Sequence, residues 1–163
     1  MSTKGYTGSM ESKTSKQLTM EAWLAFHQIR LTLLPPLVKH LSDKCGLSEA
    51  EYQVFMGIRA SEHGQLKPSQ LAEDLGWDLG RLSHQVTRME SKGLLAKQQC
   101  PEDARSCWIG VTKKGQSLFD KAFPLQIKEV ERLFGSALTQ EQMKSLIEIS
   151  QAIQMNIKKV ASD

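Results

Sequence analysis

Apolar residues recur at spacings of three and four over most of the chain, which predicts a mainly helical fold. Two short helices are predicted on either side of Gly76. The second is suited to an N-cap at Asp78 and to a C-terminal glycine at Gly93. Its apolar stripe consists of Leu82, Val86 and Met89. Its other face carries nearly all hydrogen-bond donors, a pattern typical of a helix-turn-helix.

A hairpin is predicted directly after the second helix. Residues 94–100 and 107–111 have strand character, and the segment 101–106 between them is charged. This order is that of a winged helix, with the charged segment at the tip of the wing. A carboxylate at Asp103 can hold the guanidinium of Arg105 extended through a charge-assisted bond. An arginine at a hairpin tip suits a narrow minor groove, where the negative potential is highest.

Helices are also predicted on the N-terminal side of this region. Residues 1–18 lack periodicity and are expected to form a disordered tail. Thr19 is expected to cap a helix that Pro35-Pro36 breaks or kinks, because proline donates no amide and crowds the preceding turn. Ser48 and Glu51 have the spacing of a capping box for the next helix.

Two further helices are predicted on the C-terminal side. The first begins at Thr112 and reaches about Phe134, with a bend expected at Pro124. The last begins at a capping box made by Thr139 and Gln142. Its apolar positions are Leu146, Ile149, Ile153, Ile157 and Val160. The terminal helices carry more apolar surface than one small domain can cover, which favours a homodimer.

Composition narrows the function classes. A chain of 163 residues with 40% hydrophobic residues fits one domain. The absence of a secretory signal or a long apolar run favours a cytoplasmic protein without membrane association. The net charge is only +3, but residues 79–114 carry seven basic residues against three acids. The four histidines are scattered, and no phosphate loop or nucleophile motif is visible, so we expect neither an enzyme nor a cofactor nor a metal.

Three cysteines are too few and odd in number for a disulfide scaffold. If the wing turns about Asp103 and Ala104, Cys100 and Cys107 lie opposite each other on adjacent strands. Two interpretations follow. The two residues are small apolar side chains in a hairpin, which is the more frequent case, or they form a redox-sensitive pair whose oxidation would distort the wing.

The order and spacing of several motifs resemble the winged-helix regulators of the multiple-antibiotic-resistance (MarR) family, over roughly residues 19–160. The matching segments are Leu71-Ala72, Leu75-Gly76, Ser83 to Glu90, Lys92-Gly93-Leu94, Asp103-Ala104-Arg105 and Val111 to Gly115. One departure is Gly80, where a larger polar side chain is more usual. This glycine weakens the expectation of a base contact there and costs up to about 1 kcal/mol of helix propensity.

The resemblance implies a winged helix-turn-helix at residues 47–115, flanked by dimerisation segments at 19–46 and 116–163. It also implies a two-fold dimer on a pseudo-palindromic DNA site. The residues expected on the groove floor are Arg81, His84, Gln85 and Arg88, with Arg81 best suited to a guanine edge. Those expected at phosphates are Ser83, Thr87, Lys92 and Lys97. The alternative for any one of them is a solvated helix face.

The resemblance further implies a pocket for a small amphipathic or aromatic effector. The candidates are Trp23, His27, Arg30 and Tyr52, which combine ring surface with hydrogen-bond donors. The alternative is that Trp23 and His27 belong to the core or the dimer interface. The sequence thus predicts a homodimeric, sequence-specific repressor of double-stranded DNA that a small molecule or oxidation releases. The alternative function is a winged-helix protein–protein adaptor without DNA binding.

Overall fold

The computed structural model describes residues 14–100 and 103–162, with side chains described outside 99–106. Most of the predicted tail at residues 1–18 therefore lies outside the described residues. The chain divides into two compact units, Met1–Pro35 and Pro36–Asp163. Within the described part, none of the helices has both the length and the apolar character needed to cross a membrane.

The first helix, α1 (Ser15–His40), begins earlier than predicted. The Thr14 hydroxyl accepts from the backbone N–H of Gln17 at 3.3 Å, and the Gln17 side chain accepts the Thr14 N–H at 2.9 Å. This reciprocal pair satisfies amides at the helix start. The prediction of Thr19 as the N-cap is therefore wrong, and its hydroxyl donates to the Ser15 carbonyl instead. Between residues 14 and 35 no side chain is buried.

The predicted break at Pro35-Pro36 is not observed, since α1 continues to His40 and is followed by a π-helix, Leu41–Cys45. Burial of Leu37, Leu41 and Cys45 in the unit 36–163 stabilises helical backbone beyond the prolines. The helical backbone ends at Gly46. Gly46 has a φ of 65° and donates its N–H to the Ser42 carbonyl.

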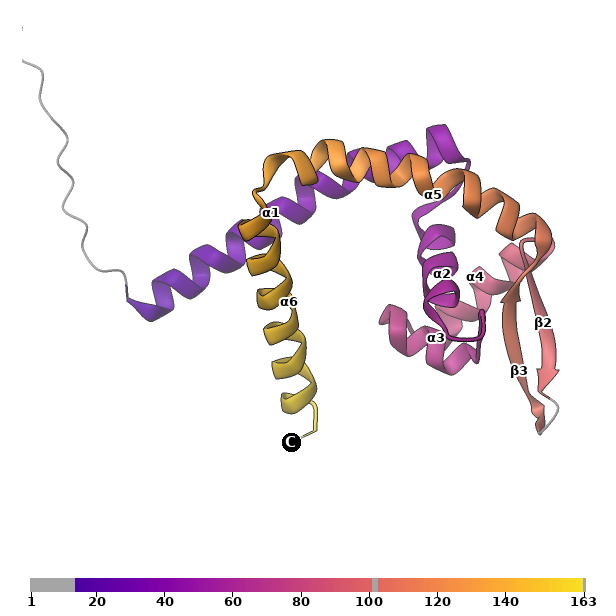
Figure 1. Cartoon of the computed structure of the whole chain (residues 1–163). Coiled ribbons are helices and arrows are strands. Elements are labelled where there is room, and N and C mark those ends of the chain that lie inside the picture. Colours follow the sequence, from indigo (N-terminus) through magenta and orange to yellow (C-terminus); the bar gives the residue numbers. More distant parts are fainter. Residues whose placement is uncertain (1–13, 101–102, 163) are drawn as a thin grey trace, which may run out of the picture. The chain divides into compact units, whose positions relative to one another are not determined.

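The predicted helix-turn-helix and hairpin are confirmed in the unit 36–163 (Figure 1). The elements are α2 (Glu49–Ala60), β1 (Gln65–Leu66), α3 (Pro68–Leu75), α4 (Leu79–Ser91), β2 (Leu95–Cys100) and β3 (Asp103–Val111). Ser48 and Glu51 form the predicted capping box, and Asp78 caps α4. The short β1 was not predicted. It pairs antiparallel with β3, and the sheet order is β1-β3-β2.

The wing differs from the prediction in its length. β3 begins at Asp103 rather than at Cys107, so only residues 101–102 lie between the strands. The backbone of Asp103, Ala104 and Arg105 therefore belongs to a strand, and the prediction that it forms the tip of the turn is wrong. Ladder pairing along β2 extends the strand further than its residue types alone indicate.

The core of this unit joins α4 to the wing and to the long helix α5 (Lys113–Leu133). Phe55 and Phe119 are almost fully buried, with ring centroids 5.4 Å apart. The predicted stripe of α4 packs into the same cluster, and each of its three residues is at most 1% exposed. This packing fixes the orientation of α4 and so decides which of its side chains face solvent.

The C-terminal part is helical as predicted. α5 starts at the Thr112 N-cap and remains one helix through Pro124, and the bend expected there stays a prediction. A short 3-10 helix, Gly135–Ala137, precedes α6 (Gln140–Val160), whose N-terminus is the predicted capping box. Nowhere along residues 140–160 is a side chain buried.

Candidate nucleic-acid interface

The candidate surface is the exposed face of α4. Its N-terminus is fixed by Asp78, whose carboxylate accepts the Arg81 backbone N–H at 2.8 Å. Because the opposite face is buried, five of the predicted residues are presented to solvent. These are Arg81, Ser83, His84, Thr87 and Arg88. Together they offer guanidinium, imidazole and hydroxyl donors on one rigid helix, a set that can bond base edges and phosphates.

The prediction that Gln85 lies on the outer face of α4 is wrong. Its side chain is only 8% exposed, so it does not lie on the open face of α4. It follows Leu82 by three positions and precedes Met89 by four, which places it on the same side as the apolar stripe. This spacing was available in the sequence and would have excluded Gln85 from the outer face.

Arg81 is held on both its backbone and its side chain. Its guanidinium carbon lies 4.0 Å from the centroid of the Trp77 ring, within the range of a cation–π contact. Trp77 lies in the turn between α3 and α4. The signal that could have indicated this contact is the i, i+4 spacing of an aromatic residue and an arginine across the start of a helix.

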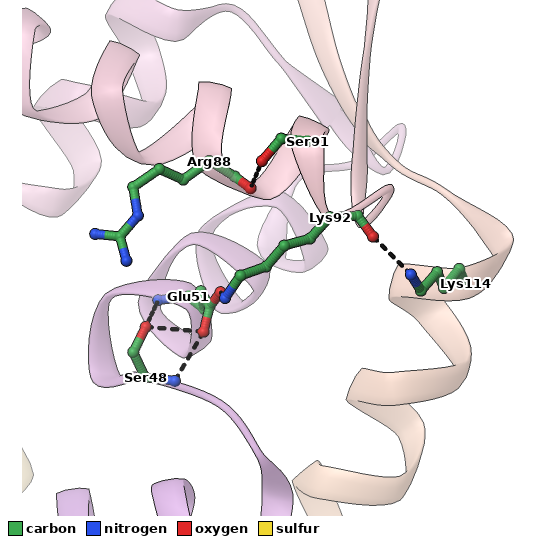
Figure 2. Close-up of polar contacts among 6 residues, drawn as sticks. All are labelled: Ser48, Glu51, Arg88, Ser91, Lys92 and Lys114. Carbon is green, nitrogen blue, oxygen red and sulfur yellow. Dashed lines mark hydrogen bonds and ion pairs between the residues drawn. The ribbon is translucent and has the colours of Figure 1, made fainter.

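Lys92 and Lys97 were predicted at phosphates, but both are engaged with carboxylates. The Lys92 ammonium lies 2.6 Å from a Glu51 carboxylate oxygen, as Figure 2 shows, and that of Lys97 lies 2.7 Å from Glu90. The Lys92 carbonyl also accepts from the ammonium of Lys114 at 2.7 Å. Lys92 thus connects the C-terminal end of α4 to α2 and α5, and its binding to phosphate stays a prediction.

Glu51 is a buried carboxylate that sequence reasoning treated only as part of a capping box. It accepts the Ser48 backbone N–H at 2.8 Å and the Ser48 hydroxyl at 2.9 Å, in addition to the Lys92 ammonium (Figure 2). Burial alone would raise the pKa of Glu51, but the hydrogen bonds from Lys92 and Ser48 outweigh it and lower the pKa. Glu51 is therefore a charged anchor between α2 and the end of α4.

The wing residues Asp103 and Arg105 belong to β3, and their side chains lie outside the described ones. Their DNA contacts stay predictions. The ladder pairs Cys107 with Gln99 and Cys100 with Asp103, across a register shift between Gln99 and Cys100. The prediction that the two cysteines lie opposite each other is therefore wrong. Cys107 is a half-buried free thiol, and the redox role of the pair stays a prediction.

The effector candidates fall in different units of the chain. Trp23, His27 and Arg30 belong to α1 before Pro35, where the rings of Trp23 and His27 stack with centroids 6.2 Å apart. Tyr52 belongs to α2, and its ring centroid lies 5.8 Å from that of Phe119. Burial is the main cause that raises the pKa of Tyr52. Their role in binding an effector stays a prediction. Across the described residues, no cluster of three or more metal-ligating side chains is found.

Known proteins match this architecture. The sequence model of the MarR family matches residues 47–107, the segment that contains the helix-turn-helix and most of the wing. AbsC, a MarR family transcriptional regulator from Streptomyces coelicolor, superposes with a TM-score of 0.80 at 26% identity, over 92% of this chain and 99% of that one. Residues 47–107 of this chain are thus a MarR-family domain. The match and the superposition support the winged-helix transcriptional regulator that the sequence motifs predicted.

Two further transcriptional regulators are similar to this chain. A second Streptomyces coelicolor MarR family regulator, whose structure was solved in complex with DNA, matches at 25% identity with a TM-score of 0.80, over 89% of this chain and 93% of that one. The organic hydroperoxide resistance transcriptional regulator of Bacillus subtilis is 33% identical over 84 residues, which are 52% of this chain and 56% of the relative.

Proposed function

We propose that this protein is a homodimeric repressor that binds a pseudo-palindromic DNA site and is released by a small molecule or by oxidation. The observation that carries the proposal is the exposed face of α4, with Arg81 and Arg88 held on a helix whose other face is buried. The relative solved in complex with DNA supports the same reading. Arg81 is the residue assigned to a guanine edge, because a guanidinium can bond O6 and N7 together.

Charge supports a nucleic-acid partner at this surface. Residues 79–114 hold a surplus of four positive charges, although the whole chain carries only +3. Lys92 and Lys97 follow α4 and are paired to carboxylates, so among the described side chains of this region the exposed guanidiniums of α4 are the positive charges best placed to meet DNA. Such a surplus raises the local affinity for phosphate and makes binding depend steeply on salt.

Dimerisation is supported by apolar residues that the single chain leaves in solvent. In α1 these include Trp23, Leu24 and Phe26, each more than half exposed. In α6 they include Ile153 at 53% and Val160 at 66% exposure. Exposed apolar area of this extent on long helices favours association with a second copy. A two-fold dimer would present two copies of α4 to half-sites about one helical turn apart.

The experiment is fluorescence anisotropy with a labelled duplex from upstream of the protein's own gene, measured against a scrambled duplex across a salt series. We expect one dimer per specific site, a steep salt dependence, and weak binding to the scrambled duplex. Aromatic acids added to the formed complex should then lower the anisotropy. If both duplexes bind weakly and a random-sequence selection also finds no preferred site, sequence-specific DNA binding is refuted. The function to test next is then the protein–protein adaptor.

A further inference from the structure

We propose that Trp77 is the positioning residue that prepares Arg81 for a guanine edge, and thereby sets sequence specificity. This inference rests on the proposed function, because it assumes that α4 reads DNA. It assigns a role to an aromatic side chain that does not itself need to touch the bases.

The contact leaves the reading atoms of Arg81 available. The Trp77 ring lies against the guanidinium with 4.0 Å between the guanidinium carbon and the ring centroid. At this distance a guanidinium can stack flat on the ring, and its N–H donors then point outward in its own plane. A guanine presents O6 and N7 as two acceptors in the major groove, and two in-plane donors match them. Trp77 can therefore fix Arg81 without competing with the base.

Trp77 is itself held in place. The Trp77 backbone N–H donates to the Ala72 carbonyl at 2.9 Å, across the turn in which Gly76 has a φ of 63°. The indole is half-buried and packs against the core cluster of the unit. Because the Arg81 backbone is also bonded to Asp78, both partners of the stack start from fixed positions.

Gly80 fits the same arrangement. A Cβ at position 80 would lie 3.1 Å from the Asp78 carboxylate oxygen, which is the atom that accepts the Arg81 N–H. Glycine leaves that cap undisturbed at the cost of a side chain next to the groove. The position before Arg81 therefore gives up its own base contact, and reading at this end of α4 falls to Arg81.

Fixing a long side chain before binding removes part of the entropy that binding would otherwise lose. We expect Trp77→Leu to weaken binding to the specific site about 3- to 10-fold, with little change for random DNA. Trp77→Phe keeps a ring with a weaker attraction for cations, so its affinity for the specific site should lie between those of the wild type and Trp77→Leu. Arg81→Ala should weaken specific binding about 5- to 150-fold and abolish discrimination at one base pair.

The test is a double-mutant cycle, measured by anisotropy on a duplex obtained by random-sequence selection with the wild-type protein. The four proteins are wild type, Trp77→Leu, Arg81→Ala and the double variant, with matching circular dichroism spectra as the check of folding. In the Arg81→Ala background, Trp77→Leu should have no further effect on affinity, because Trp77 acts on DNA binding only through the Arg81 side chain. Affinity is also measured for duplexes in which each G·C pair of a half-site is replaced in turn. At one such pair, the replacement should weaken binding of both single variants less than it weakens binding of the wild type.

Two results would overturn the inference while leaving the proposed function standing. One is wild-type discrimination in Trp77→Leu. The other is a loss of the same size with and without Arg81, which would make Trp77 a structural residue. If the wild-type protein yields no selected site, the proposed function fails and this inference fails with it. If Trp77→Leu does not fold, Trp77→Met takes its place in the cycle, because it fills the same space without a ring. Wild-type affinity and discrimination at every base pair in that variant would refute the role of the ring.

Discussion

Replacing Glu51 by glutamine tests whether the ion pair with Lys92 holds the end of α4 against α2. The wild-type carboxylate accepts hydrogen bonds on both oxygens, from Lys92 on one and from Ser48 on the other. A glutamine amide has only one acceptor oxygen, so its NH2 group must face either an ammonium or a backbone N–H. The substitution thus keeps the shape of the side chain and removes one set of bonds.

The magnitude follows from the burial of the two partners. The Glu51 side chain is 5% exposed, whereas that of Lys92 is 51% exposed and can be rehydrated when it loses its partner. Hydrogen bonds to charged groups contribute about 1.5–3 kcal/mol, and partial solvation of Lys92 favours the lower end. We expect Glu51→Gln to lower the free energy of unfolding by about 1.5–2 kcal/mol at neutral pH.

The loss should depend on pH in a defined direction. The hydrogen bonds hold the pKa of Glu51 below its ordinary value of 4.5 in the folded state, so the unfolded chain binds the proton more readily. The stabilisation is therefore complete above the unfolded-state pKa and declines as the pH falls through the folded-state pKa. The difference between wild type and Glu51→Gln should be largest near neutral pH and should shrink in acid.

The assay is urea unfolding followed by far-ultraviolet circular dichroism, at one protomer concentration because a dimer's stability depends on it. Glu49→Gln is the matched control, since Glu49 lies in the same first turn of α2 but its carboxylate accepts from the neutral Gln53 amide. It should cost about 0.3–1 kcal/mol through the helix dipole. Equal losses for the two variants, or a Glu51 deficit that persists unchanged in acid, would refute the reasoning.

Three further predictions concern other parts of the chain. Gly115→Ala should lower the free energy of unfolding by about 2 kcal/mol or more, because a Cβ there would collide with the Leu94 carbonyl. Gly135→Ala is the control, since a Cβ at that position meets nothing closer than 3.9 Å. Urea unfolding measures the stability of both variants, and equal stability would contradict the close approach at Gly115. Ile153→Glu should convert a dimer to a monomer in light scattering, and an unchanged mass would exclude this face of α6 from the interface. Arg105→Ala should weaken binding to all DNA and reduce the salt slope by about one, and unchanged anisotropy would refute its groove contact.

Features that depend on neighbours within one turn were predictable from the sequence. The capping boxes at Ser48 and Thr139, and the caps at Asp78 and Thr112, form where their spacing indicated. Each joins a side chain to a backbone amide three positions on, so the residue types and their order are sufficient. The exposed face of α4 was predictable for the same reason, and the spacing of Gln85 from Leu82 and Met89 would also have placed that residue on the buried side.

What the sequence determined by itself is therefore most of the helices, the helix starts at Ser48, Asp78, Thr112 and Thr139, and the winged-helix order that the family shares. The tertiary structure alone decided the features that join distant residues. Strand β1 exists because Gln65 and Leu66 find partners on β3, and Lys92 is paired because Glu51, 41 positions away, is buried beneath it. The wing register, which separates Cys107 from Cys100, likewise follows from ladder pairing. Local spacing encodes bonds within a turn, whereas these contacts form only once packing has brought the elements together.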